Sequence, residues 1–106
     1  MAKTNILTFK SSADILFSAG DFTSATILYF KTLFAIEDFI LLEKIGQSPK
    51  DHNERFRMLQ KYFPESYTIL DKEFSTYRDT YTKILDKPTC SRIRSLVEDE
   101  IKRHSV

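Results

Sequence analysis

The chain has one cysteine, two glycines, three prolines and no tryptophan in 106 residues, and these scarcities exclude several kinds of protein. A single cysteine cannot form an internal disulfide, so Cys90 is expected to be structural and to fit a reducing compartment. Two isolated glycines cannot build a glycine-rich phosphate loop. Neither of the two histidines has a Cys or His at ligand spacing, so the sequence predicts no metal site and no cofactor.

Long apolar runs and an excess of charge of either sign are also missing. The longest apolar runs, such as 39–42, are far shorter than the roughly 20 residues that a spanning helix needs. The amino-terminal residues lack the apolar stretch of a secretion signal. The net charge is +1, which gives no general attraction to nucleic acid or to an acidic membrane. We therefore expect a cytoplasmic protein without membrane contact.

What is present is a composition that supports one packed domain. The chain is 42% hydrophobic, with nine Phe and five Tyr. A chain of this size buries roughly two thirds of its extended surface, which is enough for a core without disulfides. Residues 1–106 are therefore predicted to form a single domain.

The glycines and prolines cut the chain into five segments with helical periodicity, because Gly favours helix ends and Pro cannot continue a helix interior. No segment alternates as a strand does. The pattern predicts an all-α, up-down antiparallel bundle of about five helices with a long central second helix. The predicted helices cover 11–19 (with 4–10 as an extension or a loose arm), 22–45, about 51–63, 64–85, and a last helix capped by Thr89 or Ser91.

Polar residues on these helices are expected to face solvent. A narrow polar stripe is predicted on the second helix, with Ser24, Lys31, Glu37, Asp38 and Lys44. The later carboxylates are interpreted as solvated faces, and Asp79 is expected to pair with Lys83 four positions on. These carboxylates are Asp71, Glu73, Asp79, Glu98, Asp99 and Glu100.

The fourth segment carries an apolar stripe at spacings of three and four. Its simplest interpretation is core; the alternative is a surface on which bases stack. Arg78 lies between Tyr77 and Tyr81, with His52 and Arg55 on the preceding segment. An arginine between two tyrosines could bind a phosphate while the rings stack on a base. The plainer alternative is an exposed arginine beside two half-buried rings. The stripe is Tyr67, Leu70, Phe74, Tyr77, Tyr81 and Ile84.

One loose pattern covers nearly the whole chain. Ala19-Gly20-Asp21-Phe22 joins a short helix to a long one that carries the Tyr29-Phe30 pair, and Pro49-Lys50-Asp51-His52 opens the next helix. This order resembles the HEPN family of small helical bundles, as does 77–81 followed by Pro88 and a final amphipathic helix. A tetratricopeptide repeat fits less well. Thr32 and Glu37 stand where that repeat expects a small residue and a proline, and no second copy follows.

The resemblance implies a test for catalysis. Many HEPN domains are ribonucleases that use an Arg, four to six residues and then a His. Here Lys83 follows Arg78 five positions on, and no other arginine precedes a histidine at that spacing. Lysine is a poor general base because it is protonated near neutral pH. We therefore expect no metal-independent ribonuclease activity.

Non-catalytic HEPN relatives bind nucleotides or nucleic acids, or accompany minimal nucleotidyltransferases in toxin–antitoxin-like pairs. The resemblance thus implies a binding or partner module, a homodimer, with a nucleotide, RNA or a small nucleotidyltransferase as partner. The alternatives are a structural dimerisation or adaptor domain without a small ligand, and a divergent ribonuclease with a relocated base. The predicted ligand-binding residues are Tyr29, Lys31, His52, Arg55, Tyr77, Arg78, Tyr81 and Lys83, and no catalytic residue is predicted.

Overall fold

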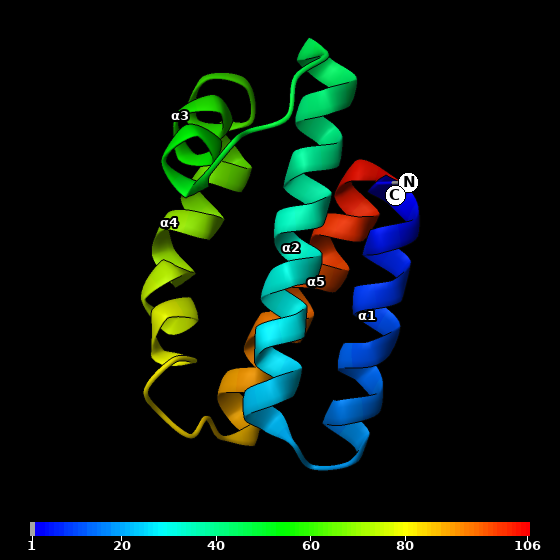
Figure 1. The fold of residues 1–106 in the computed structure, drawn as a ribbon, viewed down its shortest axis with the longest axis vertical. Helices are drawn as coiled ribbons and strands as arrows, with labels where there is room; N and C mark the ends of the chain where they lie inside the picture. Colours follow the sequence, from blue (N-terminus) through cyan, green and yellow to red (C-terminus); the bar gives the residue numbers. More distant parts are fainter. Residues whose placement is uncertain (1) are drawn as a thin grey trace.

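The computed structural model describes residues 2–106, and this part of the chain forms five helices and no strand. The predicted all-α bundle is confirmed. Figure 1 shows α2 in the middle, with α3 and α4 on one side, α1 on the other, and α5 crossing behind α2. The elements are α1 (Ala2–Ser18), α2 (Phe22–Ile45), α3 (His52–Tyr62), α4 (Pro64–Asp79) and α5 (Lys87–His104).

The long α2 is the central helix, as its nearly continuous apolar surface predicts. It contacts all four other helices, most extensively α1 and α5. Tyr29, Phe30 and Leu33 on α2 are fully buried and form the middle of the core. Cys90 on α5 is buried and free, in agreement with the structural role expected for it.

The helix ends follow the predicted punctuation. Gly20 and Gly46 adopt positive φ angles of 83° and 70°, the left-handed region that glycine tolerates best. The Asp21 carboxylate accepts a hydrogen bond from the Ser24 backbone N–H at the start of α2. Asp51 caps α3 in the same way through Glu54 N–H, at 2.8 Å.

The start of α1 decides between two predicted alternatives, and the end of α4 differs from the prediction. Residues 4–10 belong to α1, in agreement with the predicted extension of the first helix. In contrast, α4 ends at Asp79 instead of Leu85, so the prediction that Tyr81 and Ile84 lie in the core is wrong: they are 73% and 95% exposed. The Thr80 hydroxyl donates to the Tyr77 carbonyl in this last turn, at 2.6 Å.

The cap of the last helix also differs. α5 begins at Lys87 behind Asp86, whose carboxylate accepts from Thr89 N–H, in place of a cap at Thr89 or Ser91. Pro88 occupies the first turn of this helix, where its missing N–H costs nothing.

Three carboxylates predicted to be solvated are instead buried, and this prediction is wrong for Glu37, Glu73 and Glu100. Glu73 on α4 accepts two hydrogen bonds from the Arg92 guanidinium on α5, at 3.3 and 3.1 Å. A carboxylate becomes buried where a second helix crosses over it. The periodicity of one helix does not show where another helix will cross, so the sequence did not predict this burial. The predicted surface pair of Asp79 and Lys83 is confirmed at 3.4 Å.

Candidate functional site

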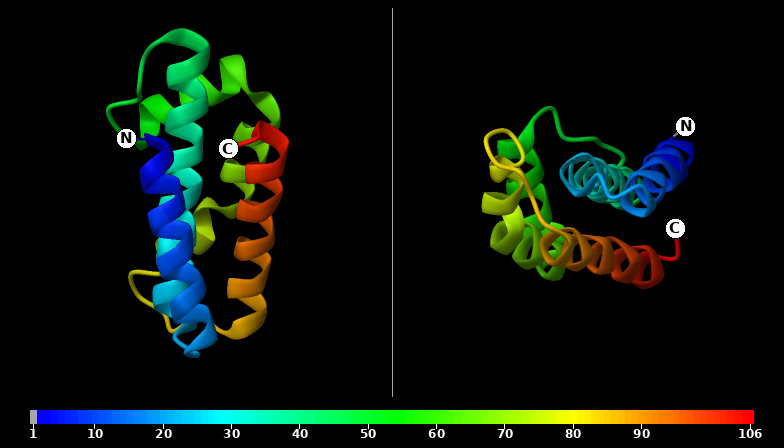
Figure 2. Two further views of the ribbon diagram at one scale, coloured as in Figure 1. Left: turned by 90° about the vertical axis from the view of Figure 1, so that its right-hand side faces the viewer. Right: turned by 90° about the horizontal axis from the view of Figure 1, so that it is seen from below.

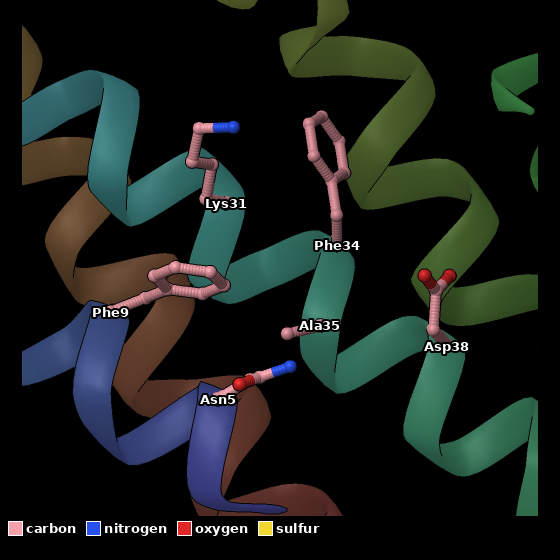
Figure 3. Close-up of a pocket in the computed structure, with 6 residues that line it drawn as sticks. All are labelled: Asn5, Phe9, Lys31, Phe34, Ala35 and Asp38. Atoms are coloured by element: carbon pink, nitrogen blue, oxygen red, sulfur yellow. The ribbon is translucent and has the colours of Figure 1, made fainter. Parts of the chain in front are cut away.

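A groove of about 430 Å³ lies between the amino-terminal half of α1 and the middle of α2 (Figure 3). Phe9 projects from α1 and Phe34 from α2, and the short side chain of Ala35 on α2 points into the groove toward Asn5. This volume is in the range of small-molecule sites, which are usually mostly apolar with a few polar groups. The lining residues are Asn5, Phe9, Lys31, Phe34, Ala35 and Asp38.

Helix geometry explains why these residues gather. Lys31, Ala35 and Asp38 are spaced at i, i+4 and i+7, so they occupy one face of α2. Asn5 and Phe9 are four residues apart on α1 and face the same space. The hollow exists because Ala35 has a small side chain, whereas Phe9 and Phe34, which also line the groove, are large. The result is an apolar slot with an amide and a lysine on its rim.

Arg55 fixes the edge of the groove at Asp38 to α3. Its Nε and Nη2 donate to the two carboxylate oxygens of Asp38, at 2.8 and 3.0 Å. The guanidinium also lies over the Phe34 ring, with 4.9 Å from Cζ to the ring centroid. Arg55 is only 8% exposed, so it is committed to these internal partners. The negative charge of Asp38 is therefore balanced at the edge of the groove.

His52 completes this junction between α2, α3 and α4. Its Nδ1 lies 2.6 Å from Arg55 Nη1, and because a guanidinium only donates, Nδ1 must accept. Burial and the neighbouring Arg55 charge lower the pKa of the imidazole from its ordinary value. His52 is therefore a neutral imidazole at neutral pH, with its ring packed against Phe34 at 4.8 Å between centroids.

Tyr77 connects this junction to the carboxyl end of α4. Its ring contacts Phe34 edge-on at 5.0 Å and Phe30 at 5.4 Å. Its hydroxyl lies 2.7 Å from that of Tyr81, and burial together with this hydrogen bond raises the pKa of Tyr77 to about 12. Tyr77 is thus partly core, while Tyr81 is largely exposed.

The structure divides the predicted binding residues into three sets. Lys31 lines the groove, and His52, Arg55 and Tyr77 form the junction behind it. Arg78, Tyr81 and Lys83 lie at the end of α4: Arg78 is exposed, and Lys83 pairs with Asp79. This third set does not line the groove: Tyr81 contacts Tyr77, and Arg78 lies over the Phe74 ring, which packs against His52.

Tyr29 is separate from all of them. It is fully buried, and its hydroxyl donates to Asp14 on α1 at 2.5 Å. Lys10 and Arg94 approach the same carboxylate, so this is an internal polar network between α1, α2 and α5. Burial and the bond to Asp14 raise the pKa of Tyr29. The structure gives Tyr29 a role in packing, with no exposed atom for a ligand.

Several lining residues have no place in the sequence-based prediction. Asn5 and Phe9 fall in a stretch whose helicity was open, and Phe34 was given no role in binding. Asp38 was assigned to a solvated stripe. The one usable signal was the row Lys31, Ala35 and Asp38, in which a small residue lies between two charged ones on an otherwise apolar helix.

A second polar cluster contains a serine, a histidine and a glutamate but lacks catalytic geometry. Ser66 Oγ donates to Glu100 Oε2 at 2.8 Å, and His104 Nε2 lies 3.3 Å from both of these oxygens. In a catalytic triad the two partners meet different ring nitrogens. Here Ser66 is buried and its proton goes to the carboxylate, so the arrangement joins α4 to α5.

Other kinds of site are not found in the described part of the chain. Within residues 2–106 no group of three His, Cys, Asp or Glu side chains is arranged to hold a metal ion. Over the same residues, no helix combines the length and apolar character needed to cross a bilayer.

No protein-family model, no curated protein and no solved structure matches this chain. The site must therefore be interpreted from its own geometry and charges.

Proposed function

We propose that the chain is a non-catalytic, HEPN-like binding module that takes a nucleotide in the groove between α1 and α2. The observation that carries this proposal is the position of Lys31 beside a groove that the Phe9 and Phe34 side chains line (Figure 3). A nucleobase is a flat apolar ring with polar edges, and stacking on an aromatic side chain such as Phe9 suits every base. An ammonium at the rim suits the phosphate attached to it.

The charges around the slot favour an anion. The Asp38 carboxylate would repel a phosphate if it were free, but Arg55 holds both of its oxygens. Lys31 is exposed, and no carboxylate within residues 2–106 forms an ion pair with it. The groove therefore has a net positive charge that comes from Lys31. The Asn5 amide, which can both donate and accept, adds a group able to contact a base edge.

The residues support binding better than catalysis. His52 is the histidine closest to the site, and its Nδ1 already accepts from Arg55. A general base needs a free lone pair within reach of the proton that it removes. The RNase spacing of Arg and His is also absent from the sequence. A pure preparation that cleaves RNA, and loses this activity on Arg78→Ala, would contradict the non-catalytic assignment.

The relationship to HEPN domains and a minimal nucleotidyltransferase partner remain parts of the proposal. The long central α2 with its Tyr29-Phe30 pair, and the start of α3 directly after Pro49-Lys50-Asp51, support the first of them. The second is tested by affinity purification of the tagged chain from its native host. Recovery of a nucleotidyltransferase in equal amounts would support it; a preparation containing this chain alone would argue against it.

Nucleotide binding is tested by calorimetric titration with AMP, GMP, CMP and UMP. Lys31→Gln is expected to weaken binding at least about tenfold, the equivalent of one lost charge-assisted contact. The matched control is Lys102→Gln, which removes an exposed lysine on α5 outside the groove. Equal affinities for wild type and Lys31→Gln would remove Lys31 from the site, and no binding of any nucleotide would overturn the proposal.

A further inference from the structure

The two ends of the groove between α1 and α2 offer opposite chemistry to a ligand. Lys31 lies at one end and Asp38 at the other, with Ala35 between them (Figure 3). The groove follows the α2 axis, because α1 runs alongside this helix (Figure 2). Lys31 and Asp38 are seven positions apart on α2, a rise of about 10 Å along the axis. A bound molecule therefore meets an ammonium donor at one end and a carboxylate acceptor at the other.

Asp38 keeps the capacity to accept hydrogen bonds after Arg55 has bound it. An ionised carboxylate has about four lone-pair sites on its two oxygens. Arg55 takes one site on each oxygen, through Nε at 2.8 Å and Nη2 at 3.0 Å. The Asp38 side chain is 33% exposed and lines the groove, so its remaining sites are accessible to a ligand there. Two-point pairing with Arg55 fixes the orientation of the carboxylate, and Asp38 is thus an oriented acceptor.

We propose, on the basis of the function proposed above, that the groove selects a nucleotide whose base carries an amino group on the edge farthest from the ribose, and that Asp38 recognises this group. With the phosphate at Lys31, the base extends along the groove toward Asp38. Adenine and cytosine present an amino group at that edge, whereas hypoxanthine and uracil present a carbonyl oxygen. A carboxylate accepts a hydrogen bond from the amino group and repels the carbonyl oxygen.

Charge favours this orientation of the nucleotide over the reverse one. The reverse orientation would place the phosphate beside the Asp38 carboxylate and the amino group beside the Lys31 ammonium, so that an anion meets an anion and a donor meets a donor. In the proposed orientation, the separation of the phosphate from Asp38 is comparable to the Debye length of about 8 Å at physiological ionic strength. Arg55 reduces their repulsion further because it pairs with Asp38. Both contacts can therefore form at the same time.

The other groups that line the groove do not distinguish an amino group from a carbonyl. Stacking on Phe9 or Phe34 suits every base. The Asn5 amide both donates and accepts, so it can turn to suit either group. Asp38 only accepts while it is ionised. Selectivity for an amino group at this edge therefore depends on Asp38.

Matched pairs of nucleotides test this selectivity in the wild-type protein. Purine riboside 5′-monophosphate is AMP without the amino group, and 2-pyrimidinone riboside 5′-monophosphate is CMP without it. Calorimetric titration is expected to show that AMP and CMP bind at least about tenfold more tightly than their counterparts, because each counterpart lacks one hydrogen bond to a charged group. Equal affinities within each pair would overturn the selectivity and leave nucleotide binding intact. If none of the four binds, the proposed function fails and the selectivity fails with it.

Two substitutions separate recognition of the base from recognition of the phosphate. Asp38→Asn keeps the shape of the side chain, but it is uncharged and its one oxygen is held by Arg55, so most of the preference for AMP over its counterpart should be lost. Lys31→Gln should weaken both nucleotides equally and leave their ratio at the wild-type value. Circular dichroism checks that both variants keep their helical content. A preference that survives Asp38→Asn would overturn the role of Asp38, since general damage to the groove would lower both affinities together.

Discussion

Arg55 on α3 holds Asp38 on α2 through two parallel hydrogen bonds across 17 positions of sequence, with the Arg55 side chain almost completely buried. This pair joins α3 to the central helix and balances a carboxylate at the edge of the groove. Two-point pairing of a guanidinium and a carboxylate fixes orientation as well as distance.

Removing one partner should therefore be costly. Asp38→Ala leaves the buried guanidinium without its carboxylate and is expected to lower the free energy of unfolding by about 2 kcal/mol, less than for a fully buried pair because Asp38 is a third exposed. Urea unfolding measures this difference. Lys50→Ala breaks the exposed Lys50–Glu54 pair and should change stability by less than about 0.5 kcal/mol. Similar losses in the two variants would show that the Arg55–Asp38 pair adds no stability of its own.

His52 should destabilise the fold in acid. Its pKa in the folded protein lies below the ordinary 6.5, because of burial and the Arg55 charge. The unfolded chain thus binds a proton first, and the free energy of unfolding falls as the pH drops from 6.5 through the folded pKa. His52→Asn keeps an acceptor for Arg55 and cannot titrate, so its stability should vary less with pH in this window. A His52 ring that titrates above 6.5 by NMR would contradict the assignment.

Glu37 should have the opposite pH dependence. It is fully buried and neither carboxylate oxygen has a hydrogen-bond partner; burial raises its pKa well above 4.5, and Glu100 adds to this against the opposing effect of Arg55. The folded state then retains a proton that the unfolded chain releases, so stability falls as pH rises above 4.5 until the folded pKa is reached. Glu37→Gln mimics the protonated form and should raise the melting temperature more at about pH 8 than at about pH 5. Equal effects at the two pH values would mean that Glu37 is already charged in the fold.

Phe9 should contribute to nucleotide affinity by stacking. Phe9→Ala is expected to weaken binding about tenfold, since one base–aromatic contact contributes about 1–3 kcal/mol. Leu7→Ala removes a side chain from the opposite side of the same helix and should leave the affinity unchanged. Calorimetry with the tightest-binding mononucleotide measures both. If the two substitutions reduce affinity equally, the loss comes from α1 as a whole and the stacking contact is not its cause.

The sequence was sufficient for the helical bundle but not for the end of α4. Gly20, Gly46 and Pro64 mark helix ends by local backbone chemistry, which acts over a few residues and can be read from one segment. The apolar periodicity through Tyr81 and Ile84 continues beyond Asp79, where the helix has already ended. Periodicity describes which residues would share a face if the helix went on, and it does not show that the helix goes on.

The site was less predictable because it depends on contacts between helices. Lys31, His52, Arg55 and Tyr77 were selected by residue type, and the structure brings these four to one region. Phe9 belongs to it only because α1 lies against α2. Contacts between helices also explain why the burial of Glu37 was not predicted. Lys31 and Asp38 on the same helix face the groove, while the position of Glu37 on α2 points into the core.

The most direct test of the proposed function is to map a bound nucleotide by NMR. Backbone amide resonances of the labelled chain are followed during titration with the mononucleotide that binds most tightly. We predict that the largest shifts occur at Asn5, Phe9, Lys31 and Ala35, with smaller shifts at His52. No change at any concentration, or changes confined to residues 78–85 at the end of α4, would contradict a binding site between α1 and α2.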